Sequence, residues 1–275
     1  MGSNRRRIHP PVSVVTGAAP GIGAALATAL HRRGGHVVVA DLDGDGGVAA
    51  VARLGERASF EQVDVGDPGA VAALVERVVD RHGSLDLLAN NAGIGLAGRV
   101  DETTDRHWER ALAVNLAGMV HGSRAAYPVM RARGRGVILN TASLAGLVPV
   151  PGMLPYMTTK WGVVGMSLGL RAEAAHHGVR VSVLCPSFVD TPLLDNPFEP
   201  PPSITGPARD RLRRLQPRML TAEQVAEAAL RGLDADRAVI AVGALSRVAW
   251  AATRVSPQGA ARLMGAVYAR DTRGD

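Results

Sequence analysis

The chain has 275 residues, of which 47% are hydrophobic, and its formal net charge at neutral pH is +6. This length and apolar content are those of one large α/β domain and exclude a disordered chain, while the single cysteine, Cys185, excludes an internal disulfide and a multi-cysteine metal site. The basic charge comes from scattered arginines without zinc-finger spacing or an aromatic-rich strand, so we expect no nucleic-acid partner.

Short apolar runs alternate with segments of helical spacing along the chain. The apolar runs predict strands at 12–16, 36–41, 58–65, 85–89, 136–141 and 179–184, with a candidate seventh at 238–242. Helical spacing predicts helices at 21–33, 48–54, 68–82, 105–131 and 156–176, the third with Asp67 as its N-cap and Gly83 as its stop. Such repeated β-α units predict a single α/β domain, about residues 11–243, in which helices cover both faces of a parallel sheet.

Three regions lie outside this alternation. Residues 1–10 form an N-terminal extension. Residues 187–218 are rich in proline and too long for a routine connection, which indicates either a substrate lid or a partly disordered segment. Residues 244–275 carry apolar residues at helical spacing around the helix start Ser256-Pro257 and predict an amphipathic helical tail. We expect its apolar stripe to pack on its own domain or a neighbouring subunit, or to make a peripheral membrane contact, and both interpretations remain open.

A glycine-rich loop separates the first predicted strand from the first helix. It reads Thr16-Gly-Ala-Ala-Pro-Gly-Ile-Gly23, and its glycines allow a tight turn close to a pyrophosphate. The free N–H groups and the positive dipole end of the following helix suit phosphate groups. Its position between a strand and a helix favours a dinucleotide site over an ordinary glycine-rich turn.

Asp41 ends the second predicted strand, 18 residues after Gly23. A carboxylate at this place accepts hydrogen bonds from both hydroxyls of an adenosine ribose and repels a 2′-phosphate. No basic residue lies in the glycine loop to bind such a phosphate. The sequence therefore favours NAD over NADP, the alternative being that Asp41 only starts the turn that follows it.

Lys160 is the only lysine in a chain that otherwise uses arginine, and Tyr156 stands four residues before it. Residues four apart share one face of a helix, so we expect the ammonium to favour the phenolate and to lower the pKa of Tyr156. Arginine cannot replace lysine where a compact ammonium must fit a pocket. Ser143 closes the fifth strand at the carboxyl edge of the sheet, where its hydroxyl can polarise a substrate oxygen.

These motifs resemble those of the short-chain dehydrogenase/reductase family, from about Val12 to Val242. The resemblance implies a Rossmann-type, doubly wound sheet of seven parallel strands. It also implies that Asn115 holds a water for the proton relay and that Lys160 binds the nicotinamide ribose. The family's Pro-Gly pair after the sixth strand is replaced here by Pro186-Ser187, a departure that can shift the loop backbone near the nicotinamide.

The motifs and the resemblance together assign one set of residues to the cofactor and another to catalysis. The cofactor set is Gly17, Ala19, Gly21, Ile22, Gly23, Asp41, Leu42, Asp64, Val65, Asn91, Ala92, Gly93, Tyr156, Lys160, Pro186, Val189 and Thr191. Within it, the resemblance implies that Asp64 binds the adenine amino group. The catalytic set is Asn115, Ser143, Tyr156 and Lys160. We expect no metal, because the histidines show no ligand spacing.

The predicted function is that of an oxidoreductase that transfers a hydride between NAD(H) and a secondary alcohol or its ketone. An apolar segment after Ser143 and the apolar lid residues favour an apolar substrate, such as a terpenoid, a steroid or a lipid-derived compound, although the lid arginines leave an acidic substrate open. These apolar lid residues are Leu193, Leu194, Phe198 and Ile204. The alternatives are an NADP-dependent ketone or 3-oxoacyl reductase and a catalytically silent dinucleotide-binding sensor or scaffold. We expect a cytoplasmic homodimer or homotetramer, because the family commonly forms such oligomers and no apolar stretch approaches the roughly 20 residues that span a bilayer.

Overall fold

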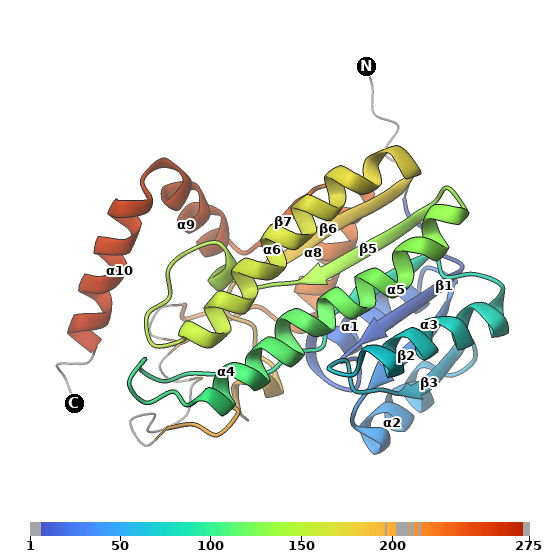
Figure 1. Ribbon diagram of the computed structural model, residues 1–275, viewed down its shortest axis with the longest axis horizontal. Helices are drawn as coiled ribbons and strands as arrows, with labels where there is room; N and C mark the ends of the chain where they lie inside the picture. The colour runs from blue at the N-terminus through green and yellow to red at the C-terminus, as the bar shows by residue number, and fades with distance from the viewer. Residues whose placement is uncertain (1–6, 196, 202–208, 210–211, 214–215, 272–275) are drawn as a thin grey trace.

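The computed structural model of the chain describes residues 7–195, 197–201, 209, 212–213 and 216–271. Its strands are β1 Val12–Thr16, β2 His36–Asp41, β3 Ala58–Gln62, β4 Leu87–Asn90, β5 Gly136–Thr141, β6 Val179–Pro186 and β7 Val239–Val242. They form one parallel sheet in the order β3-β2-β1-β4-β5-β6-β7 (Figure 1). The predicted doubly wound Rossmann-type sheet is confirmed. The strand order reverses between β1 and β4, and folds of this kind bind ligands at the carboxyl ends of the strands beside that point.

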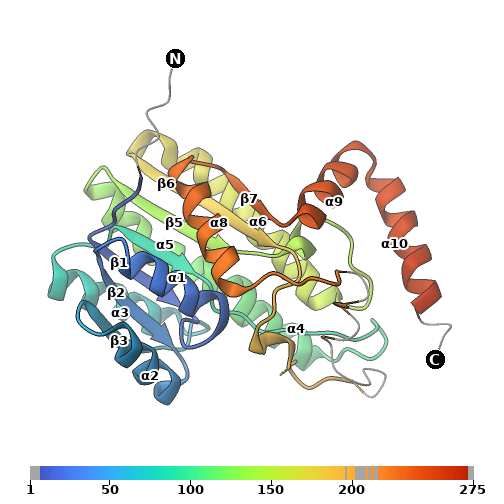
Figure 2. The same cartoon turned by 180° about the vertical axis from the view of Figure 1, so that it is seen from behind.

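Helices cover both faces of the sheet, as predicted (Figures 1 and 2). One face carries α1 Gly21–His31, α2 Gly44–Leu54 and α8 Ala222–Asp234, and the other carries α3 Pro68–His82, α5 Gly118–Ala132 and α6 Leu154–Ala174. Leu26 and Leu30 of α1 pack with Leu230 of α8 in the first core. Val71 and Leu74 of α3 lie in the second core. The sheet is therefore buried on both sides, which explains why its strands read as continuous apolar runs.

Capping residues explain where several elements begin and end. The α3 helix has the predicted bounds, because the Asp67 carboxylate accepts the Gly69 N–H (2.8 Å) and Gly83 ends the helix in the left-handed conformation. The α2 helix begins at Gly44 rather than Val48, since Asp43 caps it by accepting the Gly46 N–H (3.0 Å). These short polar contacts leave no trace in the apolar spacing on which the prediction of α2 rested.

Two strands are shorter than predicted because polar turns flank them. The β3 strand ends at Gln62 rather than at residue 65, where Asp64 accepts the N–H of Gly66 (2.8 Å) and turns the chain. The β4 strand begins at Leu87 rather than at residue 85, since Ser84 donates its hydroxyl to the Asp86 carboxylate (2.8 Å) in the preceding turn. Beyond the strand ends a few backbone hydrogen bonds to the sheet remain, among them those from the Val63 N–H to the Asp41 carbonyl and from the Asp86 N–H to the Val12 carbonyl (both 2.9 Å).

The long helix predicted at 105–131 is interrupted. It consists of α4 Asp105–Ala111, a π-helical turn over Leu112–Ala117, and α5. The π-helical turn contains Asn115, whose side chain binds the backbone of Ile94. Such turns are frequent at functional sites, and apolar periodicity does not predict them.

Two helices follow β7 and stand beside the sheet rather than on it (Figures 1 and 2). They are α9 Ala244–Val255 and α10 Pro257–Asp271. Leu245, Ala249 and Trp250 of α9 pack against the core cluster that contains Leu147 and Val148. No helix within the described residues is long and apolar enough to cross a membrane.

Candidate active site

The glycine-rich loop follows β1 at the point where the strand order reverses. Gly17 adopts a φ of +62°, and a Cβ there would lie 2.6 Å from Cα of Ala92. A Cβ on Gly23 would lie 2.0 Å from the Gly17 carbonyl oxygen. Only glycine fits these two positions, so the loop passes close to the segment after β4 and to the first turn of α1.

Asn91 ties this loop to the segment after β4. Its side-chain Nδ2 donates to the carbonyl oxygens of Thr16 (3.2 Å) and Gly17 (3.0 Å), and its backbone N–H donates to Thr16 Oγ1 (2.9 Å). Ala92 donates its N–H to the same hydroxyl (3.2 Å). Two predicted cofactor segments that lie far apart in the sequence are thereby fixed against each other.

The first turn of α1 presents its backbone N–H groups without a side-chain cap. Pro20 is the N-cap residue and makes no capping hydrogen bond, and the first turn holds no acidic residue. Ile22 in this turn packs on the core, while Thr191 lies against Gly21 from the other side of the site. An uncapped helix N-terminus beside a crowded glycine loop fits the pyrophosphate of a dinucleotide.

The Asp41 carboxylate lies at the glycine loop. One of its oxygens accepts the Ala19 N–H (2.8 Å) and the other accepts the Asp43 N–H (3.1 Å), so its orientation is fixed by the backbone. Each carboxylate oxygen keeps further acceptor capacity. Leu42 beside it is exposed. Asp41 and Leu42 therefore lie beside the loop that is predicted to bind the cofactor.

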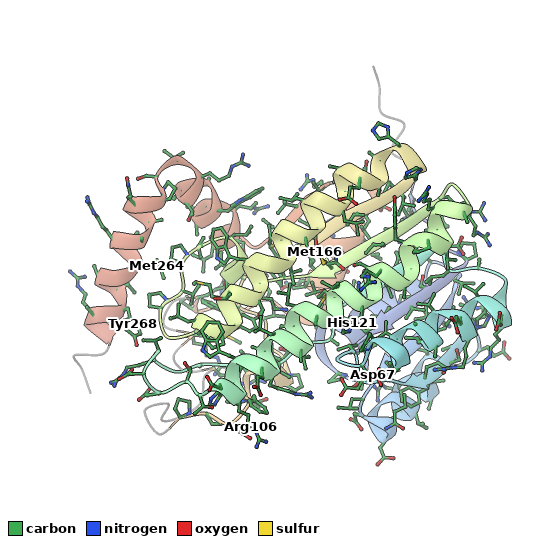
Figure 3. The ribbon with its side chains drawn as sticks, viewed as in Figure 1. Asp67, Arg106, His121, Met166, Met264 and Tyr268 are labelled. Carbon is green, nitrogen blue, oxygen red and sulfur yellow. The ribbon has the colours of Figure 1, made fainter. Side chains whose placement is uncertain are left out.

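Asp64 and Val65 lie beyond the end of β3. The Asp64 carboxylate accepts the Gly66 N–H, and the carbonyl oxygen of Val65 accepts a hydrogen bond from His121 Nδ1 (3.0 Å; His121 is labelled in Figure 3). Val65 is buried, and a Cβ at Gly118 would lie 2.9 Å from its Cγ2. Helix α5 therefore holds this predicted adenine-binding segment in place.

Ser143, Tyr156 and Lys160 come together at the carboxyl end of β5. The hydroxyl of Tyr156 is hydrogen-bonded to Ser143, and the Lys160 ammonium lies 5.5 Å from the centre of the Tyr156 ring. Lys160 Nζ also donates to the carbonyl oxygen of Thr141 (3.1 Å). Both α6 residues are buried, so the proton-bearing groups are shielded from bulk water.

Asn115 lies on the same side of the site. Its Oδ1 accepts the Ile94 N–H (2.8 Å) and its Nδ2 donates to the Ile94 carbonyl (3.0 Å), which holds the π-helical turn in register with the segment after β4. A Cβ at Gly93 would lie 3.0 Å from Asn115 Oδ1 and 3.5 Å from Lys160 Nζ. Gly93 therefore leaves room between the amide and the ammonium.

Burial controls the ionisation of the two central groups. It raises the pKa of Tyr156 above its ordinary value, and the hydrogen bond with Ser143 only partly opposes this effect. It lowers the pKa of Lys160 to about 8. The prediction that the pKa of Tyr156 is lowered is therefore wrong, because desolvation of the buried phenol outweighs the hydrogen bond with Ser143.

The segment after β6 borders the site from the opposite side. Pro186 is the last residue of β6, and the Ser187 N–H donates to the Val242 carbonyl (3.0 Å), so the chain follows β7 beyond the strand. Ser187 is not among the non-glycine residues with positive φ, and serine in place of the family's glycine therefore strains no backbone there. Val189 and Thr191 are buried. Serine at position 187 therefore does not require the loop backbone to shift.

The sequence reasoning missed two residues that contact the catalytic groups. The Thr141 carbonyl accepts a hydrogen bond from the Lys160 ammonium, and the buried Cys185 thiol lies near both Lys160 and the Ser143 backbone. Burial raises the pKa of Cys185 to about 12, so the thiol is neutral. The position of Cys185 directly before Pro186, at the carboxyl end of β6, was the available signal.

Apolar side chains surround Tyr156. Leu96, Ala111 and Ala145 are buried with it, and Val150, Met153 and Phe198 pack against this cluster. Phe198 thus joins the site as expected, and Leu193 and Leu194 lie in a short 3-10 turn, Pro192–Leu194, whereas Ile204 lies outside the described residues. Among the described residues no cluster of histidine, cysteine and acidic side chains could hold a metal ion.

Known proteins resemble this chain in sequence and structure. A family model described as short chain dehydrogenase matches residues 11–201. Momilactone A synthase from Oryza sativa subsp. japonica is 39% identical over 196 residues, which cover 70% of this chain and 72% of that protein. The 15-hydroxyprostaglandin dehydrogenase [NAD(+)] of Mus musculus is 36% identical over 196 residues, 69% of this chain and 71% of that protein. The crystal structure of a short chain dehydrogenase/reductase from Burkholderia phymatum in complex with NAD superposes with a TM-score of 0.77 at 30% identity, covering 86% of this chain and 90% of that one.

Proposed function

The chain belongs to the short-chain dehydrogenase family of oxidoreductases, and from this premise we propose that it interconverts a secondary alcohol and its ketone with NAD(H) as the cofactor. The observation that carries the proposal is the buried group formed by Ser143, Tyr156 and Lys160, in which Tyr156 is hydrogen-bonded to Ser143 and faces the lysine ammonium. A protein that only binds a dinucleotide has no use for this arrangement.

The chain's own residues move the proton and hold the substrate oxygen. A bound nicotinamide dinucleotide supplies the chemistry of hydride transfer to or from the substrate carbon. Ser143 donates a hydrogen bond to the substrate oxygen, and Tyr156 takes the hydroxyl proton in the oxidation or returns it in the reduction. Lys160 stabilises the phenolate while it exists, and Asn115 helps to connect Tyr156 to solvent through its place beside Lys160.

The raised pKa of Tyr156 favours one direction at neutral pH. Because the phenol stays protonated, it is ready to donate to a ketone oxygen, whereas the oxidation first requires its deprotonation. We expect kcat for alcohol oxidation to rise with pH above neutrality and kcat for ketone reduction to fall once the phenol ionises. Initial rates in both directions across one buffer series test this, and parallel pH profiles would contradict it.

The preference for NAD rests on Asp41. Its carboxylate is fixed at the glycine loop by Ala19 and Asp43, where it would bind ribose hydroxyls and repel a 2′-phosphate. The relative named for NAD(+) and the related structure that contains NAD support this choice. Calorimetric titration of both cofactors should give clearly tighter binding of NAD.

Two variants make the cofactor test specific. We expect Asp41→Ala to weaken NAD binding about ten-fold or more, because it removes charged hydrogen bonds to the ribose. It should also reduce the difference in affinity between NAD and NADP, because it removes a charge that repels the 2′-phosphate. Asp45→Ala, an exposed residue in the first turn of the neighbouring helix α2, should leave both affinities unchanged. Tighter binding of NADP than NAD by the unmodified protein would overturn the assignment.

The apolar cluster around Tyr156 supports an apolar alcohol, such as a terpenoid, a steroid or a lipid-derived compound. The direct experiment offers NAD and a panel of secondary alcohols and follows the reduced nicotinamide by absorbance, with Tyr156→Phe as the inactive control. Turnover with NADP and ketones alone would favour the reductase alternative. Tight NAD binding without turnover of any alcohol or ketone would favour a silent sensor or scaffold.

We also propose that the protein is a cytoplasmic homodimer or homotetramer. The support for assembly is the apolar outer side of α6, where Trp161 is 44% and Leu168 is 41% exposed, and the support for location is the free, buried Cys185. Light scattering after size exclusion gives the mass, and Trp161→Glu should shift it towards the monomer. A wild-type monomer at micromolar concentration would contradict the assembly, and fractionation of cells tests the location.

A further inference from the structure

An apolar cavity of about 440 Å³ lies outside the catalytic group, at the end of the molecule that carries α10. Its walls are Arg99, Val100, Asp101, Pro149, Val150, Pro151, Gly152, Leu154, Met157 and Tyr268. We call this cavity the vestibule. Its volume falls in the range of small-molecule sites. Three segments that lie far apart in the sequence form it: the chain before α4, the chain leading into α6, and the tail.

Backbone contacts hold two of these segments together. The Gly98 N–H donates to the Gly152 carbonyl (2.8 Å), and Gly98 pairs with Met153 in a parallel bridge. The Val150 N–H donates to the sulfur of Met157 (3.2 Å), which fixes the turn between Val150 and α6. The floor of the vestibule is therefore a defined surface that does not depend on the tail.

The tail supplies the outer wall through Tyr268. A Cβ on Gly152 would lie 3.2 Å from Cε2 of Tyr268, so the aromatic ring rests on the backbone of Gly152. Met264 and Tyr268 lie one helical turn apart on the side of α10 that faces the rest of the molecule, and both are partly covered (Figure 3). Leu263, by contrast, is 64% exposed. Helix α10 therefore faces the vestibule along a single side.

The vestibule adjoins the reaction centre. Val150 packs against the apolar cluster that contains Tyr156, and it also lines the vestibule. Met157, another wall residue, directly follows Tyr156 on α6. One layer of apolar side chains therefore separates the two spaces, so a substrate whose oxygen is at Tyr156 can extend into the vestibule by displacing the side chain of Val150.

The polar groups at the rim bind each other. The Arg99 guanidinium donates to both carboxylate oxygens of Asp101, at 3.2 and 2.7 Å. This pair leaves the wall without a net charge to attract an ionic ligand, and the remaining wall residues are apolar apart from the Tyr268 phenol. The chemistry of the vestibule suits an uncharged hydrocarbon group.

From this arrangement we propose that the vestibule binds the hydrocarbon body of the substrate and that Tyr268 of α10 determines how large a body the enzyme accepts. The proposal rests on the proposed function and extends it, because it identifies the substrates as uncharged alcohols and ketones with a hydrocarbon chain or ring system that reaches past Val150. Helix α10 thereby becomes part of the substrate site.

A series of alkan-2-ols from butan-2-ol to decan-2-ol tests the proposal with the full-length protein. In the wild type, kcat/KM should rise roughly three- to four-fold for each added methylene that enters the vestibule. For Tyr268→Ala this rise should flatten, with a loss of about ten-fold on decan-2-ol that appears in KM and a smaller loss on butan-2-ol. Tyr268→Phe, which keeps the ring, should restore the wild-type dependence, and Leu263→Ala on the exposed side of α10 should resemble the wild type.

A binding measurement separates this proposal from the proposed function. The fluorescence of N-phenyl-1-naphthylamine, which increases in apolar surroundings, should show binding to the wild type and displacement by decan-2-ol, and Tyr268→Ala should weaken both. If the probe binds in this way but no alcohol is oxidised, the vestibule stands and the proposed function fails. If alcohols are oxidised with the same chain-length dependence in wild type and Tyr268→Ala, the vestibule proposal is overturned. It is also overturned if Leu263→Ala changes the chain-length dependence of kcat/KM and Tyr268→Ala does not, with a change in oligomeric mass that explains the effect of Leu263→Ala.

Discussion

The cofactor edge and the vestibule are built on different principles. At the cofactor edge, the loop from Thr16 to Gly23 is held by hydrogen bonds to Asn91 and by contacts so close that a methyl group would not fit. At the vestibule, Gly98 and Gly152 share one backbone hydrogen bond, and the walls are apolar apart from the Arg99–Asp101 pair at the rim and the Tyr268 phenol. The first region leaves no room for an added methyl group, whereas the second offers an apolar surface. The chemistry therefore depends on exact geometry, while substrate choice depends on adaptable shape.

The largest effect is expected from the residue between the two regions. Tyr156→Phe should lower kcat by roughly 10²–10⁴-fold, because only the transferable proton is lost. Cofactor affinity should stay within a few-fold of the wild type, since the cofactor edge is unchanged. Steady-state rates and calorimetric titration measure the two quantities. Tyr127→Phe on α5 is the matched control. A near wild-type kcat for Tyr156→Phe would contradict the proposal that Tyr156 transfers the proton.

A methyl group added to the cofactor edge should have the next largest effect. Gly23→Ala places a Cβ 2.0 Å from the Gly17 carbonyl oxygen and should cost roughly 1–3 kcal/mol of unfolding free energy, with weaker cofactor binding. Gly265→Ala on α10 is the control, because nothing lies within 4 Å of its Cβ, and it should stabilise the protein by about 0.5–1 kcal/mol. Urea unfolding and cofactor titration measure both variants. Similar results for the two would contradict the crowding argument.

The buried Lys160 is expected to be required for turnover while it lowers the stability of the folded protein. Burial lowers the pKa of Lys160 to about 8, below its unfolded value, so the unfolded state binds the proton more tightly. This group therefore destabilises the folded protein increasingly as pH falls from about 10.5 to about 8, and below that range the destabilisation is about 3 kcal/mol. Lys160→Met should abolish turnover and yet unfold at a higher temperature than the wild type at pH 7, by differential scanning calorimetry. A lower unfolding temperature would show that the Thr141 contact outweighs the desolvation.

The smallest effect is expected at the vestibule wall. Met157→Leu keeps the apolar volume, so the unfolding free energy should change by less than about 1.5 kcal/mol and kcat on a short alcohol by no more than about two-fold. Its KM for long alcohols should shift instead, because the shape of the wall changes. Unfolding curves and KM values for two chain lengths test this. A large fall in kcat on the short alcohol would mean that catalysis depends on the exact geometry of the vestibule wall, as it does on that of the cofactor edge.

The parts that local patterns encode were predictable from the sequence. Buried parallel strands are continuous apolar runs, and β1, β2 and β5 have the predicted bounds for this reason. Helix α3 was equally predictable, because Asp67 and Gly83 mark its ends. The motif residues of the candidate site come together because the carboxyl ends of parallel strands meet at one edge.

The remaining features depend on contacts between distant segments. The π-helical turn around Asn115 has no signature in the apolar period, because its partner Ile94 belongs to another part of the chain. The raised pKa of Tyr156 follows from complete burial, which residue spacing does not show. The vestibule requires Tyr268 to meet Gly152, and nothing in the helical stripe of the tail identifies that partner.

The tail helices have a consequence for how such an enzyme diversifies. The predicted proton-transfer and cofactor residues all precede α8, whereas the outer wall of the vestibule comes from α10, the last helix described. Recombination that replaced only the 3′ end of the gene would exchange this wall and keep the catalytic apparatus intact. Related enzymes could in this way acquire new substrates by exchange of the segment that encodes the tail helices, while each intermediate keeps its catalytic residues.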